Sequence, residues 1–121
     1  MLAHEMHHAK RRRTVGYGSS LLEASASEGL ADSFAMEITG NGPPLWSVVL
    51  TGSDLDNWII TARSTWTNNS YDHSKWFFGT MEVPRWTGYS IGFKLVKDFI
   101  STNPTRKASD LFDEPAGSFV Q

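Results

Sequence analysis

The sequence contains no cysteine and no long apolar run. The absence of cysteine excludes disulfide bonds and thiolate zinc sites, so histidine and carboxylate side chains remain as the strong metal ligands. Fully apolar runs such as 48–50 and 58–60 are far shorter than the about 20 residues of a membrane-spanning helix. Residues 1–13 are polar and lack the apolar segment of a signal peptide. We therefore expect no membrane contact and a cytoplasmic location.

Neither acidic nor basic residues are in large excess. The formal net charge is -2, from 11 basic and 13 acidic residues, and this balance does not favour nucleic acid as a partner. Hydrophobic residues make up 40% of the 121 residues and aromatic residues 12%, including five Trp. This composition suffices for the core of one domain, in which the tryptophans build packed surfaces.

Apolar spacing and chain breakers predict a mainly helical domain. The expected helices cover residues 1–13, 20–39, 44–51, 54–66, 84–101 and 107–112. Ser20 and Glu23 fit a capping box at the start of the second helix. We expect residues 67–83 to form a loop with an extended piece at 76–78.

The first predicted helix carries an HExxH motif, His4-Glu5-Met6-His7-His8. Residues four apart lie on one face of a helix, so His4 and His8 can bind the same ion. Glu5 lies beside them, where its carboxylate can act as the base toward a water activated by the metal. The alternative is a solvated, histidine-rich helix end or a purification tag, although a tag does not require Glu at the second position.

A zinc site needs a third protein ligand, and Glu28 on the second predicted helix is the best candidate. Gly29 beside it costs about 1 kcal/mol relative to Ala within a helix, which a close approach of the two ligand helices would explain. Asp32 follows one turn later on the same face and can accept the free N–H of a ligand histidine. Glu23 and Glu37 compete with Glu28 as ligands, although the capping box already accounts for Glu23.

The spacing of these motifs resembles that of known protein families. An HExxH helix, 19 intervening residues and the sequence EGLAD from Glu28 resemble the gluzincin group of zinc metallopeptidases. With WFFG at 76–79 and WTGYSIGF at 86–93, nearly the whole chain resembles a bacterial family of predicted zinc-dependent proteases. The resemblance implies a zincin-like helical zinc-binding core, a Zn²⁺ cofactor and a single metallopeptidase domain over residues 1–121.

The resemblance also implies roles for individual residues. It assigns the ligands His4, His8 and Glu28, the catalytic base Glu5 and the ligand partner Asp32. In related enzymes a Tyr or His outside the ligand helices stabilises the oxyanion, and Tyr89 matches that role. Family members carry an upstream sheet that aligns the peptide substrate, whereas only three residues precede His4 here. We therefore expect an N-terminally truncated chain, the C-terminal part of a longer family domain that lacks most of this β-sheet.

Other candidate residues can be interpreted either as functional or as purely structural. Tyr89 lies between Gly88 and Gly92, which permit close approach of another backbone, and it can equally be a core aromatic. His73 is a second candidate for the oxyanion or a solvated loop histidine, and His7 points away from the ligand face, so we expect it to be exposed. The cations at 10–13 predict a solvated helix end, with phosphate or an acidic partner as the alternative.

These features together predict zinc-dependent hydrolysis of a peptide bond, with a peptide or protein as substrate. Two alternatives stay open: a non-catalytic or regulatory metal-binding domain, and a zinc-dependent esterase. A serine mechanism has no support, because residues 18–20 do not form a nucleophile elbow. Loss of an upstream sheet would expose apolar surface, so a homo-oligomer is a further expectation.

Overall fold

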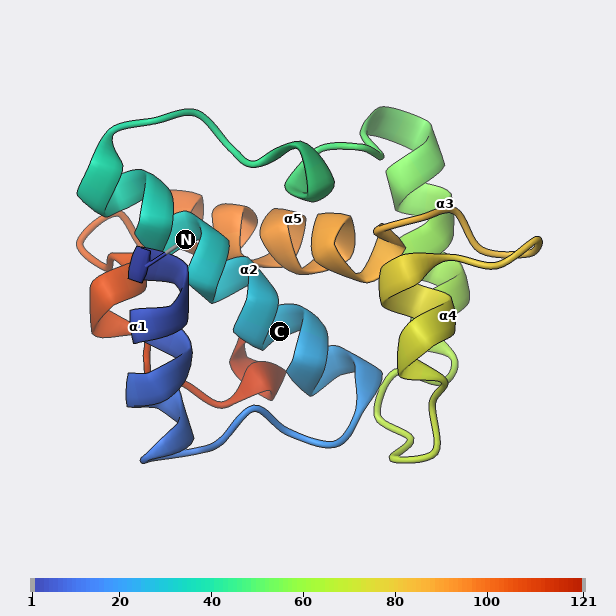
Figure 1. The fold of residues 1–121 in the computed structure, drawn as a ribbon, viewed down its shortest axis with the longest axis horizontal. Helices are drawn as coiled ribbons and strands as arrows, with labels where there is room; N and C mark the ends of the chain where they lie inside the picture. The colour runs from blue at the N-terminus through green and yellow to red at the C-terminus, as the bar shows by residue number, and fades with distance from the viewer. Residues whose placement is uncertain (1, 121) are drawn as a thin grey trace.

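The computed structural model describes residues 2–120, and between these residues it contains helices and no strand (Figure 1). The mainly helical fold class is therefore confirmed. The α-helices are α1 (Leu2–Arg12), α2 (Leu21–Thr39), α3 (Gly52–Arg63), α4 (His73–Phe78) and α5 (Thr87–Thr102). Three short 3₁₀ helices accompany them: η1 (Leu45–Ser47), η2 (Ala108–Asp110) and η3 (Ala116–Val120). No helix within residues 2–120 is long and apolar enough to cross a membrane.

Helix α2 is the central element, packed against α5 and against α1 (Figure 1). Its first twelve residues are almost all buried. The predicted capping box starts it: Glu23 N donates to Ser20 Oγ at 3.2 Å, and Ser20 N donates to Glu23 Oε1 at 3.2 Å. The two helices that carry the metal-ligand candidates are thus α1 and α2, and α2 is held from both sides.

Two glycines let α2 and α5 approach at backbone distance. A Cβ atom on Gly29 would overlap the carbonyl oxygen of Gly92, and one on Gly92 would overlap the carbonyl oxygen of Ser25. The close approach expected at Gly29 is therefore real, but it faces α5 and not the ligand helix α1. This close backbone packing of α2 against α5 involves Gly29, which directly follows Glu28 in the chain.

Residues 67–83 differ from the predicted loop. The segment 76–78 is not extended but belongs to α4, because Asp72 caps that helix by accepting a hydrogen bond from Lys75 N at 3.1 Å. Trp76 and Phe77 become buried there. Helix α5 begins at Thr87 and not at Pro84, since Trp86 adopts a left-handed backbone conformation with φ 68°. The short helices expected at 44–51 and 107–112 are single 3₁₀ turns.

Two residues of α1 expected in solvent are buried against the C-terminal segment 108–114. His7 is 3% exposed, and its Nε2 donates to the carbonyl of Ala108 at 2.9 Å. Arg11 is 2% exposed, and its Nε donates to Ser27 Oγ at 3.2 Å. Its Nη1 donates to the carbonyl oxygens of Leu111, Phe112 and Glu114, at 3.3, 3.2 and 2.7 Å. The prediction of an exposed His7 and a fully solvated basic helix end was wrong, because the C-terminal segment folds back onto α1.

Candidate metal centre

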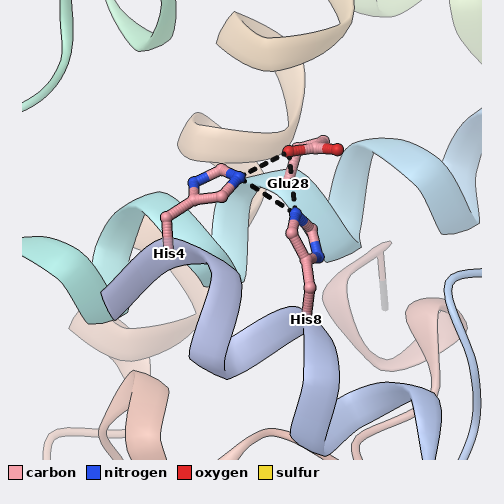
Figure 2. Close-up of side chains that lie close together, drawn as sticks. All are labelled: His4, His8 and Glu28. Atoms are coloured by element: carbon pink, nitrogen blue, oxygen red, sulfur yellow. Dashed lines mark hydrogen bonds and ion pairs between the residues drawn. The ribbon is translucent and has the colours of Figure 1, made fainter. Parts of the chain in front are cut away.

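Three side chains from α1 and α2 converge on one point. Figure 2 shows His4 and His8 projecting from α1 toward Glu28 on α2. His4 Nε2 lies 3.0 Å from His8 Nε2 and 3.2 Å from Glu28 Oε1. His8 Nε2 lies 3.1 Å from Glu28 Oε1. All three residues are buried, at 7%, 7% and 9% exposure.

Helical geometry explains the convergence. His4 and His8 are one turn apart on α1, so their rings leave the helix on the same side, with centroids 4.6 Å apart. Glu28 lies in the buried first half of α2, which packs against α1. The packing of two helices therefore closes a triangle of three electron-pair donors.

The donor set fits zinc. Neutral imidazole nitrogens and a carboxylate oxygen are ordinary zinc ligands, and two histidines with one glutamate make a known catalytic set. Ligand atoms around a tetrahedral zinc at about 2.0–2.1 Å are about 3.3 Å from one another. The 3.0–3.2 Å edges of the triangle are close to this separation. Three protein ligands leave one tetrahedral position for water or substrate.

Asp32 fixes the orientation of His4. Its Oδ1 accepts a hydrogen bond from His4 Nδ1 at 2.7 Å, so in the neutral ring the lone pair available to a metal is on Nε2. Its Oδ2 accepts from Trp46 Nε1 at 2.9 Å and from Ser47 Oγ at 2.6 Å. Asp32 is 0% exposed, and three donors offset the cost of burying its charge. The residue lies where the sequence argument expected a partner of a ligand histidine.

Tyr17 was not anticipated from the sequence. Its hydroxyl donates to Glu28 Oε2 at 2.9 Å, which leaves Oε1 for the cluster. Tyr17 lies in the turn between the ligand helices, flanked by Gly16 and Gly18 with φ of 81° and 98°. The available signal was an aromatic residue between two glycines, directly between the two motif helices. Trp46 and Ser47 lie on η1 and carried no comparable signal.

The electrostatics of the cluster favour a positive charge. Burial lowers the pKa of His4, but the hydrogen bonds and charges of Asp32 and Glu28 outweigh it and raise that pKa to about 9. Burial raises the pKa of Glu28, but hydrogen bonds from His4, His8 and Tyr17 lower it to about 2. A carboxylate held ionised between imidazoles is the arrangement that a divalent metal stabilises.

The cluster opens onto a cavity of about 390 Å³. Its walls are His4, Glu5, His8, Arg12, Tyr17, Glu28, Trp46, Trp86 and Tyr89. The Glu5 side chain is 67% exposed, and its Oε1 lies 3.9 Å from His4 Nε2, so Glu5 stands beside the ligand triangle without being part of it. Tyr89 packs its ring against Phe77 and Trp46, with centroids 5.0 and 6.4 Å apart. Burial, with the charges of Glu28 and Asp32, raises the pKa of Tyr89 to about 12.

The competing residues lie elsewhere. The Glu23 carboxylate is engaged in the capping box, and Glu37 is exposed on α2. His73 starts α4, where its ring stacks on Phe77 at 4.4 Å and its Nδ1 is hydrogen-bonded to the Tyr71 hydroxyl at 2.7 Å. It does not line the cavity. The structure therefore brings together His4, His8, Glu28, Asp32, Glu5 and Tyr89, whose chemical roles stay predictions.

One comparison with known proteins gives a match. A family model described as "Predicted Zn-dependent protease (DUF2268)" matches residues 1–121. No curated protein and no solved structure shows a significant match. The matched range includes every residue of the cluster and of the cavity wall.

Proposed function

The chain belongs to this family of predicted zinc-dependent proteases, and from that membership we propose that it hydrolyses peptide bonds with zinc held by His4, His8 and Glu28. The proposed ligand set, two histidines on α1 and a glutamate on α2, resembles that of the gluzincins. The observation that carries the proposal is the buried triangle of donor atoms at 3.0–3.2 Å, open to a cavity large enough for part of a peptide.

Zinc at this position would lower the pKa of a water molecule and polarise the carbonyl group of the substrate. Glu5 supplies the base: its carboxylate accepts a proton from the attacking water and passes it to the nitrogen of the leaving amine. Support comes from its place in the cavity wall, beside the ligands but outside their triangle. A carboxylate that is itself a ligand would be a poor base, because its lone pair would be engaged.

Tyr89 supplies the donor for the oxyanion. Its hydroxyl belongs to the cavity wall, and the raised pKa, about 12, keeps the proton on the oxygen at neutral pH. A neutral hydroxyl can donate to a carbonyl oxygen as negative charge develops there. Asp32 and Tyr17 act one step away, by holding His4 and Glu28 in place through the hydrogen bonds at 2.7 and 2.9 Å.

Substitution of Glu5 separates chemistry from metal binding. Zinc-loaded wild-type protein should hydrolyse casein or a peptide pool, and a chelator should abolish the activity. Glu5→Gln should keep its zinc and lose roughly 10²- to 10⁴-fold of turnover, as expected for a positioned base. Glu37→Gln is the matched control, since Glu37 is exposed on α2 and away from the cavity. Tyr89→Phe should also keep zinc and lose about 10²-fold of turnover.

The outcomes separate the alternatives. Full zinc without hydrolysis of any peptide or ester would favour a non-catalytic metal-binding domain. Hydrolysis of a simple ester without hydrolysis of peptides would favour an esterase. Undiminished turnover in Glu5→Gln would remove the proposed base and leave only the zinc assignment.

A further inference from the structure

The cavity at the metal centre contains a cation that the proposed chemistry does not use. Arg12 follows His8 by four residues on α1, so its side chain leaves the helix on the side of the ligands. It is exposed, and it lines the cavity together with Glu5 and Tyr89. A guanidinium at this position faces whatever binds over the metal.

Within the described part of the chain, the Arg12 side chain is left without a partner. Among residues 2–120 it forms no hydrogen bond and no ion pair, whereas Arg11 is bonded to the C-terminal segment and Arg106 is paired with Glu114. Arg13 is exposed and unpaired over the same residues, but it does not line the cavity. The two neighbouring arginines therefore differ in position alone, which makes Arg13 the control for Arg12.

An aromatic wall adjoins this cation. Trp46, Trp86 and Tyr89 all line the cavity. Trp86 is the one non-glycine residue between 2 and 120 with positive φ, at 68°. A positive φ is uncommon for a bulky residue and is found at turns and at ligand sites. Trp86 directly precedes α5, and the guanidinium of Arg85 lies 4.0 Å from the centroid of its ring.

The charges of the cavity favour an anion. Zinc with two neutral imidazoles and one carboxylate retains a single positive charge, and Arg12 offsets the negative charge of Glu5. Asp32 adds a negative charge behind His4 but does not line the cavity, so the positive charges that would face a bound substrate are the metal and Arg12. A guanidinium binds a carboxylate through two parallel hydrogen bonds, which an amide isostere of the same shape cannot match.

We propose that this cavity selects peptides with a carboxylate close to the scissile bond, and that Arg12 is the specificity-determining residue. The inference rests on the proposed peptidase function. The carboxylate can belong to an acidic side chain or to a free C-terminus, and the chemistry of recognition is the same. Trp46 and Trp86 contact the apolar part of the same substrate.

Paired peptides test this inference by affinity. The first pair differs by Glu against Gln in a C-terminally amidated hexapeptide, and the second by a free against an amidated C-terminus in an apolar one. Titration into zinc-loaded Glu5→Gln protein, followed by calorimetry, measures binding without turnover. The carboxylate member of at least one pair should bind about tenfold more tightly, or about 1.4 kcal/mol. The pair that shows the preference identifies the source of the carboxylate.

Variants of the two arginines complete the test. In the same background, Arg12→Gln should reduce the preference to less than about twofold, Arg12→Lys should restore part of it, and Arg13→Gln should leave it unchanged. Equal binding within both pairs, or a preference that survives Arg12→Gln, would overturn the inference. A wild-type chain that hydrolyses nothing but keeps an Arg12-dependent preference would overturn the peptidase proposal and uphold carboxylate recognition.

Discussion

At the scale of single residues, the candidate metal centre depends on side chains that contact the proposed ligands and are not ligands themselves. Asp32 is completely buried and uses both carboxylate oxygens, one toward His4 and one toward Trp46 and Ser47. A buried carboxylate is costly unless its oxygens are hydrogen-bonded. Because these partners come from α1 and η1, Asp32 fixes the His4 ring and also ties η1 to the site.

Tyr17 orients Glu28 as Asp32 orients His4, and removal of the Tyr17 hydroxyl should weaken metal binding. Tyr17→Phe deletes the hydroxyl that donates to Glu28 Oε2 at 2.9 Å and keeps the ring. Zinc affinity should fall by about 10- to 100-fold, as is usual for partners of metal ligands. Competition with a chelator of known affinity measures it. Tyr71→Phe is the control, because that hydroxyl is bonded to His73; an equal loss in both variants would mean that the effect is not specific to Glu28.

The sequence identifies the candidate metal ligands more readily than the residues that hydrogen-bond to them and hold them in place. His4 and His8 follow from a helical spacing, and Asp32 follows from the position of Glu28 on the same helix face. Tyr17 and Trp46 reach the site from a turn and a 3₁₀ helix. Their contacts depend on how those segments fold over α2, which no local spacing encodes. Arg11 and His7 were misjudged for the same reason, since the segment that buries them lies about a hundred residues further on.

At the scale of elements, α2 must pack closely against α5 while it presents Glu28 to α1. The pair Gly29 and Gly92 makes the first contact possible. A side chain there would push the helices apart and shift Glu28 relative to the histidines. The geometry of the metal cluster is therefore set partly by the contact between Gly29 on α2 and Gly92 on α5.

Gly92→Ala should destabilise the fold. The added methyl group would overlap the backbone of Ser25, and overpacking of this kind costs about 3 kcal/mol. Gly117→Ala is the matched control, because a Cβ there has no atom within 4 Å, and it should change stability by less than about 0.5 kcal/mol. Urea unfolding of both variants measures the difference. A Gly92→Ala protein as stable as the wild type would contradict the packing described for α2 and α5.

The C-terminal segment is a second element on which the site depends. Arg11→Met keeps the aliphatic stem but leaves the carbonyl oxygens of Leu111, Phe112 and Glu114 without their donor. The cost should be about 3 kcal/mol, since buried polar groups lose their partners. Arg13→Met, on an exposed residue, should cost less than about 0.5 kcal/mol. Similar thermal unfolding of the two variants would show that the segment does not depend on Arg11.

Elements with strong local signals were predicted, and elements made by packing were not. The capping box and the GNGPP break define α2, and the structure has both of its ends as expected. By contrast, WFF at 76–78 has the composition of a strand but is helical, because Asp72 caps α4 and Trp76 packs edge-on against Trp58 at 5.9 Å. Tertiary contacts decided the conformation there.

At the scale of the whole molecule, a metal ion would join two helices that a short turn connects. Zinc bound to the proposed ligands His4, His8 and Glu28 would crosslink α1 to α2. Any ligand that binds only the folded state raises its stability by mass action. Helix α1 also carries Arg11, which binds the C-terminal segment, and Arg12, which lines the cavity. The same crosslink would therefore fix the positions of that segment and of the cavity wall relative to α2.

Zinc content of the purified chain and its variants tests the assignment of the metal centre most directly. Wild-type protein should contain about one zinc per chain, as a site with three protein ligands predicts. His8→Ala and Glu28→Ala should lose tight binding, whereas Glu37→Ala, on an exposed residue of α2, should keep it. A chain that retained stoichiometric zinc after both His4→Ala and His8→Ala would contradict the site described here.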